Sequence, residues 1–168
     1  MSRFGLLLAI FLLSGCGYHQ PGRSANLPPE VQTLYVELFS NRTTEPLLEN
    51  FITDRVVDRF ARTGRLRLVE SRESADAVLS GLVTGYSTAS ISYDRRDIIT
   101  EYRSIMTISV VLRQKSDERV IWKGNVDWSE EYPASPDKSA QEDNEAAAID
   151  VICDRLAQEL YFRIMENF

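Results

Sequence analysis

Residues 78–93 (VLSGLVTGYSTASISY) and residues 98–114 (IITEYRSIMTISVVLRQ) are two long runs rich in β-branched, aromatic and small side chains. Only the polar tetrapeptide Asp94-Arg95-Arg96-Asp97 separates them. Two such runs around a short polar turn predict an antiparallel hairpin with unusually long arms. Apolar and polar residues alternate in the second arm, which predicts one buried face and one mostly polar face. The buried face holds Tyr102, Met106, Ile108, Val110 and Leu112, and the polar face holds Glu101, Arg103, Thr107, Ser109 and Arg113.

A third strand is predicted on the C-terminal side of this hairpin. The turn at residues 115–118 leads into residues 120–132, where Val120, Trp122, Val126 and Trp128 alternate with Lys123, Asn125 and Asp127. A tryptophan pair can stack on a ligand, but its position on the apolar face favours core packing.

The N-terminal side predicts a strand, a helix and a second strand. Residues 31–39 form the first strand, with Leu34, Val36 and Leu38 on one face, and residues 40–44 end it. The helix has Thr44 as its expected N-cap and Gly64 as its C-terminal stop. Residues 66–70 are the second strand, so a right-handed parallel crossover is expected. The apolar stripe of the helix holds Leu48, Ile52, Val56 and Phe60, widened by Leu47, Phe51 and Val57.

A second amphipathic helix is predicted from Asn144 nearly to Phe168, after a loop at residues 133–143. Its stripe holds Ile149, Ile152, Cys153, Leu156, Leu160 and Ile164. These elements predict an α+β two-layer sandwich. Two amphipathic helices pack on one face of a mixed, mostly antiparallel sheet of four to five strands, and the other face stays free.

The first 16 residues have the order of a bacterial lipoprotein signal. Arg3 precedes the apolar residues 4–13, and Leu13-Ser14-Gly15-Cys16 follows. The apolar segment is shorter than the roughly 20 residues that span a bilayer, so it predicts a cleaved signal peptide. The run around Cys16 resembles a lipobox, which implies diacylglycerol and an N-acyl chain on Cys16. Beyond these covalent chains, we predict no cofactor. The alternative is an ordinary secreted protein with a chance cysteine at the cleavage site.

The predicted organisation is a signal peptide at 1–15, a lipidated cysteine and flexible tether at 16–30, and one domain at 31–168. Two or more acyl chains on one residue hold a protein on a membrane without a transmembrane helix. Cleavage leaves 153 residues with a formal charge of −7, since Arg3 is the only charged residue removed. Such an acidic chain is poorly suited to nucleic-acid binding. The remaining Cys153 lies in the helical stripe, which favours a buried side chain over a reactive thiol.

The sequence offers little for catalysis. The only histidine, His19, lies in the predicted tether, where no general base is held in place. Neither a Cys/His cluster for zinc nor a glycine-rich phosphate loop between a strand and a helix is present. Acidic pairs such as Glu130-Glu131 are ordinary for a solvated surface. We therefore predict no catalytic and no metal site.

Basic residues near turns are the candidate contact residues. Arg95 and Arg96 lie in the hairpin turn, and Lys115 and Arg119 flank the next turn. Paired arginines can bind phosphate through bidentate hydrogen bonds. The alternative is a pair of ordinary solvated turns.

Several short motifs follow one another along nearly the whole chain. They are Gly15-Cys16-Gly17-Tyr18, residues 41–47 (NRTTEPL), Ala75-Asp76-Ala77, Thr88-Ala89-Ser90, residues 101–106 (EYRSIM) and Asp143-Asn144-Glu145. Together, these motifs resemble the lipopolysaccharide-assembly lipoprotein family of the outer membrane. The resemblance implies an α/β sandwich, in agreement with the pattern of predicted elements.

The resemblance also implies a function, a location and partners. The family sits inside a large outer-membrane β-barrel, where it plugs the lumen, assists barrel assembly and helps pass lipopolysaccharide to the cell surface. A compact body of this size has a radius of gyration of roughly 15 Å, so only a barrel of more than about 22 strands holds it. Gly17 after Cys16 agrees with sorting to the outer membrane, on its periplasmic face. The alternative is a lipoprotein regulator or secretion-pore component that docks on a periplasmic enzyme or assembles into a ring.

The resemblance further implies that lipopolysaccharide phosphates contact basic residues of the hairpin and of the last helix. Arg95 and Arg96 occupy the hairpin position. At the helix, Glu142 stands directly before Asp143, so Lys138 is the nearest basic candidate.

Overall fold

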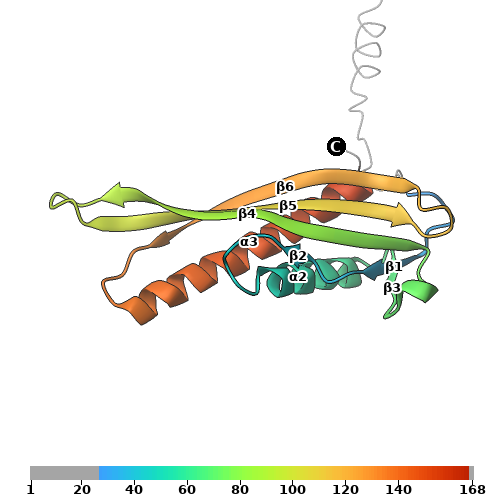
Figure 1. The fold of residues 1–168 in the computed structure, drawn as a ribbon, viewed down its shortest axis with the longest axis horizontal. Coiled ribbons are helices and arrows are strands. Elements are labelled where there is room, and N and C mark those ends of the chain that lie inside the picture. Colours follow the sequence, from blue (N-terminus) through green and yellow to red (C-terminus); the bar gives the residue numbers. More distant parts are fainter. Residues whose placement is uncertain (1–26, 167–168) are drawn as a thin grey trace, which may run out of the picture.

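The structure, a computed structural model, describes residues 27–166. Within them, a sheet of five successive strands, in the order β3-β1-β4-β5-β6, packs against two helices (Figure 1). A further short strand, β2, pairs with β4. The elements are β1 (Thr33–Val36), β2 (Ser40–Asn41), α2 (Leu48–Thr63), β3 (Arg67–Leu68), the 3₁₀ turn η1 (Arg72–Ser74), β4 (Ala77–Tyr93), β5 (Ile99–Gln114), β6 (Val120–Pro133) and α3 (Lys138–Glu166).

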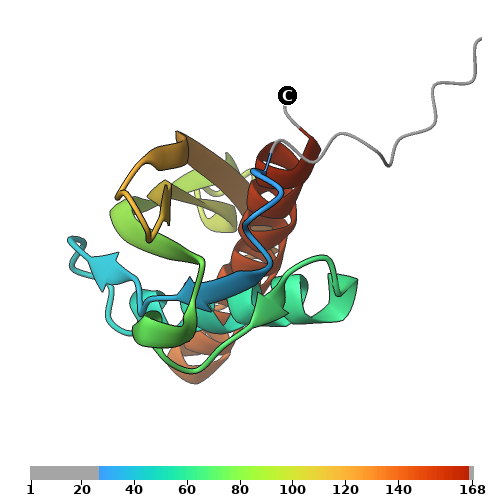
Figure 2. The same ribbon diagram turned by 90° about the vertical axis from the view of Figure 1, so that its right-hand side faces the viewer.

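The strand pairing is mixed, as predicted. β1 runs parallel to β3 and β4, whereas β4, β5 and β6 form an antiparallel meander. The long hairpin is confirmed almost residue for residue, because its register extends from Ala77–Gln114 to Tyr93–Ile99. Both helices lie on one side of the sheet, and its other face is left free by the described residues (Figure 2).

Helix α2 buries the predicted stripe, since Leu48, Ile52, Val56 and Phe60 are at most 1% exposed. Gly64 ends the helix with φ of 63°, a left-handed conformation that glycine adopts without strain. Two details of the prediction are wrong. The helix starts after Leu47 rather than at Thr44, and the side chains of Leu47 and Phe51 are exposed rather than part of the stripe.

The true entry to α2 is built by Asn41. Its Oδ1 accepts hydrogen bonds from Thr43 N (2.9 Å) and Thr43 Oγ1 (2.8 Å), and its Nδ2 donates to Glu45 O (2.7 Å). These bonds form a compact turn that delays the helix to Leu48, because the asparagine competes with the helix for backbone groups. Leu47 adopts φ of 66° at the end of this turn.

Strand β1 is shorter than predicted and ends at Val36. Leu34 is fully buried, but Leu38 lies beyond the strand and is 62% exposed, so its assignment to the buried face is wrong. Asp76 ties β1 to the start of β4, since Oδ2 accepts hydrogen bonds from Thr33 N (2.9 Å) and Thr33 Oγ1 (2.7 Å). The Thr33 side-chain bond, together with backbone amides, lowers the pKa of the Asp76 carboxyl.

Helix α3 begins at Lys138, six residues before the predicted start. Asp137 Oδ1 accepts a hydrogen bond from Ala140 N (2.9 Å), which caps the first turn. Gln141 reaches back and accepts from Ser135 N (2.8 Å). Prolines at 133 and 136 suggested a loop up to residue 143, but a proline before an N-cap is compatible with helix entry. The predicted stripe is buried.

The two tryptophans of β6 differ. Trp122 packs against the core, and its indole lies over Gly124, where an added Cβ would come within 2.8 Å of the ring. Trp128 is 39% exposed, so core packing was the wrong prediction for it. It lies opposite Met106, in the half of β6 that is nearer to Pro133. Toward that end, in the direction of the β4–β5 turn, α2 no longer covers the sheet (Figure 1).

Candidate functional site

The five basic residues predicted to contact a ligand lie at two ends of the elongated molecule. The β4–β5 turn, with Arg95 and Arg96, and the start of α3, with Lys138, lie at one end (Figure 1). The β5–β6 turn, with Lys115 and Arg119, lies at the other end. The structure therefore does not assemble the five into one site.

The β4–β5 turn is held by Asp94. Its Oδ1 accepts hydrogen bonds from Arg96 N (2.7 Å) and Ile98 N (3.0 Å), which lower the pKa of the Asp94 carboxyl. The Arg96 guanidinium folds back to Asp94 Oδ2 at 3.2 Å, while the Arg95 side chain is exposed and makes no ion pair with the residues from 27 to 166. Arg95 is thus the cation most directly available to an anionic ligand at this turn.

The remaining basic candidates have local partners. The Lys115 amine donates to Glu73 O, and the Arg119 guanidinium donates to Gln114 Oε1 at 2.6 Å. Lys138 pairs with Glu142 across one helical turn at 3.4 Å. A hollow of about 340 Å³ opens beside Lys115, but Glu30 and Asp76 also line it. Its mixed charge favours no anion.

A network of hydroxyls centred on Glu145 lies between strands β4 and β5 and helix α3, and sequence reasoning missed it. Glu145 Oε1 accepts hydrogen bonds from Tyr86 OH (2.7 Å) and Thr88 Oγ1 (3.1 Å). Ser104, fully buried, lies within hydrogen-bond distance of both hydroxyls, at 3.1 and 2.7 Å. Burial raises the pKa of the Tyr86 phenol, so it remains a donor. Thr88 and Glu145 were part of the family motifs, which was the available signal.

Two further groups mark this region. Burial, and then the negative charge of Glu145, raise the pKa of Glu45. Tyr132 stacks on Tyr102 with ring centres 5.8 Å apart, and its buried hydroxyl has no partner among the described residues. The distal half of the sheet is therefore packed through polar and aromatic contacts rather than through an aliphatic core.

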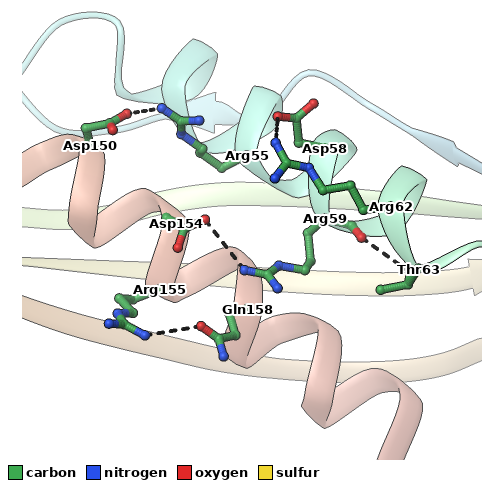
Figure 3. A network of polar contacts seen from close by, with 9 residues as sticks. All are labelled: Arg55, Asp58, Arg59, Arg62, Thr63, Asp150, Asp154, Arg155 and Gln158. Atoms are coloured by element: carbon green, nitrogen blue, oxygen red, sulfur yellow. Dashed lines mark hydrogen bonds and ion pairs between the residues drawn. The ribbon is translucent and has the colours of Figure 1, made fainter.

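A ladder of ion pairs joins α2 to α3 (Figure 3). The Arg55 guanidinium donates to Asp150, which raises the pKa of Arg55, and Arg59 lies 3.6 Å from Asp154. Arg62 pairs with Asp58 at 3.1 Å on the same helix. The hollow between these side chains is only about 60 Å³. The ladder is a bridge between α2 and α3 rather than a binding cavity.

Metal ligands, the remaining cysteine and membrane spans were further questions that the sequence raised. Residues 27–166 contain no group of three His, Cys, Asp or Glu side chains that could hold a metal ion. Cys153 is fully buried, and burial raises its pKa to about 12, which confirms the prediction of a core side chain over a reactive thiol.

No described helix is long and apolar enough to cross a bilayer. Cys16, the signal peptide and most of the predicted tether lie outside the described residues.

Comparison with known proteins agrees with the fold. A family model described as "LptE: Lipopolysaccharide-assembly" matches residues 31–164. No curated protein matches the chain in sequence at a significant level.

Solved structures share the fold at low identity. Rare lipoprotein B from Shewanella oneidensis has 13% identity and a TM-score of 0.52, with 77% of this chain and 90% of that chain covered. An uncharacterised lipoprotein B from Nitrosomonas europaea has 10% identity and a TM-score of 0.56, with 86% and 88% covered. The PelC dodecamer from Paraburkholderia phytofirmans has 12% identity and a TM-score of 0.53, with 83% and 92% covered. At such identities these neighbours support the fold alone.

Proposed function

The chain belongs to the LptE lipopolysaccharide-assembly family, whose model spans nearly all of the described residues, and we propose that it is a non-enzymatic, lipid-anchored subunit of the outer-membrane lipopolysaccharide translocon. In this function it plugs and helps to assemble a large β-barrel, and it aids lipopolysaccharide transfer. The observation that carries the proposal is the family match over residues 31–164. The lipobox-like run at Cys16 supports the anchor.

The shape and polarity of the described residues suit a plug. The sheet face opposite the helices carries polar side chains along β5 and β6, among them the Arg103–Glu131 ion pair with Nε and Oε1 3.1 Å apart. A polar surface is compatible with the polar lumen of a large barrel. The hairpin turn with Arg95 and Arg96 stands at the far end of this face (Figure 1).

Gentle detergent extraction of the native, acylated chain through an affinity tag tests the proposal. We expect one large heat-modifiable β-barrel in equimolar ratio. Recovery of a periplasmic enzyme, or of a ring of this chain alone, would instead establish the alternative class of lipoprotein. Cys16→Ala is the anchor control, and we expect it to release the protein into the soluble periplasmic fraction without acyl mass.

We further propose that Arg95 and Arg96 bind lipopolysaccharide phosphates, with Lys138 contributing from the same end. Replacing both arginines with Gln removes charge without placing a new carboxylate beside Asp94. We expect weaker, less salt-dependent binding to lipopolysaccharide and an unchanged thermal unfolding transition. The matched control is Lys115→Gln with Arg119→Gln at the opposite end, which should leave binding unchanged. Equal loss in both pairs would indicate general charge attraction.

A further inference from the structure

One edge of strand β4 pairs with β5 along nearly its whole length, whereas the other edge is paired only near its start. On the side away from β5, it pairs with β1 at residues 77–79 and with β2 at residues 82–83. Beyond Val83, no described strand pairs with this side. We propose that the free edge of β4, residues 84–92, binds an extended segment of a partner polypeptide by strand addition.

The backbone groups available for such pairing follow from the register. Arg42 N donates to Val83 O (3.1 Å), so the backbone groups of Val83 point away from β5. A bulge follows, and Gly85 lies opposite Thr107. On the other side of β5, Ala134 N donates to Thr100 O (2.9 Å). The backbone N–H and C=O groups of even-numbered β5 residues therefore point toward β6, and those of odd-numbered residues point toward β4.

The ladder between β4 and β5 then uses Gly85, Ser87 and Ala89, which lie opposite Thr107, Ile105 and Arg103. The amides and carbonyls of Tyr86, Thr88 and Ser90 consequently point outward. No hydrogen bond to these outward backbone groups is present within residues 27–166 beyond the sheet ladder. Strand addition would satisfy six backbone groups in one register.

The side chains along this edge would not hinder the pairing of a new strand. Residues 84–92 (TGYSTASIS) contain no charged residue and no proline. Exposed edge strands are normally protected by charges, prolines or covering elements, so an uncharged edge of nine residues is typical of a strand that is covered in use.

The opposite edge of the same three-stranded region is protected. By the same register, the backbone N–H and C=O groups that point away from β5 on β6 belong to Lys123, Asn125, Asp127, Ser129 and Glu131. Three of these five carry charge, and Arg163 Nη1 already donates to Asn125 O at 3.0 Å. The contrast within one sheet favours β4 as the edge that accepts a partner.

The β4 edge is also held in place before binding. Thr88 Oγ1 is anchored by Glu145 at 3.1 Å and by Ser104 at 2.7 Å, and the Tyr86 hydroxyl is anchored by the same two residues. These bonds fix the side chains of two of the three outward residues on the helix side of the sheet. A rigid acceptor strand loses little conformational entropy on binding.

The register excludes a second copy of this chain as a good occupant. An antiparallel pairing centred on Thr88 is the one in which the outward backbone groups of all three residues meet those of the copy. It places Tyr86 opposite Ser90 of the copy and Thr88 opposite Thr88. That pairing would also place the copy's Tyr93 and Asp94 beside Val83 and Leu82, where Asn41 and Ser40 of β2 already pair. A single extended segment that ends or turns at the exposed Arg42 has no such conflict.

The occupant is therefore a separate extended segment of about five residues that ends or turns beside the exposed Arg42. Its source rests on the proposed function, in which the partner is the barrel subunit.

Hydrogen–deuterium exchange resolved to single residues tests the inference, with the tagged full chain measured in native outer membranes and after purification to monomer. In the monomer, we expect fast exchange at Tyr86, Thr88 and Ser90 and slow exchange at Gly85, Ser87 and Ala89. In the membranes, the three fast amides should slow at least tenfold. Fast exchange in both samples would overturn strand addition, and slowing that appears in the monomer at high concentration would show a second copy instead.

Matched proline variants separate backbone pairing from side-chain effects. Thr88→Pro removes one outward N–H of β4 and no ladder bond, and Ser129→Pro does the same on β6. Thr88→Ala controls for the lost hydroxyl. We expect Thr88→Pro alone to reduce partner recovery at least tenfold, at unchanged helix content by circular dichroism. Equal recovery with Thr88→Pro and Ser129→Pro would contradict the proposal.

The two proposals fail separately. If the barrel copurifies while the β4 edge exchanges fast in membranes, strand addition is wrong and the translocon function stands. If the edge is protected but the copurifying partner is not a barrel, the strand addition stands and the translocon function is wrong.

Discussion

The two halves of the long sheet are held together by different forces. Near β1 and β2, the sheet is covered by α2 and α3, and its inner face is aliphatic, with Leu79, Val83 and Val110 fully buried. Toward the β4–β5 turn, α2 no longer covers the strands (Figure 1). There, Tyr86 and Ser104 on the inner face form a hydrogen-bonded network with Glu145 of α3. The first half supplies stability, and the second presents a shaped, polar surface with a free strand edge.

The largest expected effect comes from the aliphatic half. Phe60 is 1% exposed and packs edge-on against Tyr161 with ring centres 5.2 Å apart. Phe60→Ala should lower the free energy of unfolding by about 3–5 kcal/mol because it leaves a cavity. Urea denaturation measures the change, and Ile98→Ala, at a side chain 54% exposed near the hairpin turn, should stay within about 0.5 kcal/mol. Similar losses at both positions would remove the distinction between the halves.

The polar half should respond more weakly. Ser104→Ala removes the hydroxyl that contacts both Tyr86 and Thr88 in a fully buried position. We expect a loss of about 1–3 kcal/mol in unfolding free energy because Tyr86 and Thr88 each lose a buried hydrogen-bond partner and keep only Glu145. Ser129→Ala on exposed β6 is the control and should be nearly neutral. A neutral Ser104→Ala would show that the network is not a structural element of the distal half.

The junction between β1 and β4 should show a pH-dependent effect. Thr33 and backbone amides lower the folded-state pKa of Asp76 below the ordinary aspartate value of 3.8. A depressed carboxyl pKa contributes stability that is present above the unfolded-state value and is lost as pH falls through the folded-state value. Asp76→Asn should therefore cost about 1 kcal/mol at pH 7, and thermal unfolding should show the difference from the native chain shrinking between about pH 4 and pH 2. A difference that stays constant to pH 2 would assign the loss to packing.

The smallest effect is expected on the helix surface. Asp150 pairs with Arg55 between side chains that are 55% and 37% exposed. Asp150→Ala should change the unfolding free energy by only about 0.2–1 kcal/mol, since water screens exposed ion pairs. The change should diminish further in 1 M salt. A loss as large as that of Phe60→Ala would show that the ladder, rather than the aliphatic half, holds α2 on α3.

Periodicity predicted the elements whose side chains alternate between core and water. The long hairpin, the α2 stripe and the α3 stripe follow from it, because a buried face imposes a repeat of 2 or 3.6 on the sequence. The errors fall where local hydrogen bonds decide the chain path. Asn41 moved the start of α2 from Thr44 to Leu48, and Asp137 moved the start of α3 to Lys138.

The candidate site was predictable only in part. Arg95 and Arg96 were identified because a charged turn between two apolar runs is visible in the sequence. The Glu145 network was not, since it joins residues 86, 88, 104 and 145 that come together only when the hairpin lies against α3. The free edge of β4 was not visible in the sequence, because the uncharged residues 84–92 are typical of a strand with neighbours on both sides.

By itself, the sequence determined the element types, the buried stripes and the lipobox-like start, since each depends on neighbours within a few positions along the chain. Only the tertiary structure decided which basic residues share an end, which hydroxyls meet Glu145, and where β4 lacks a neighbour. Those properties arise from pairings between distant segments, and β1 and β2 are simply too short to cover the 17 residues of β4.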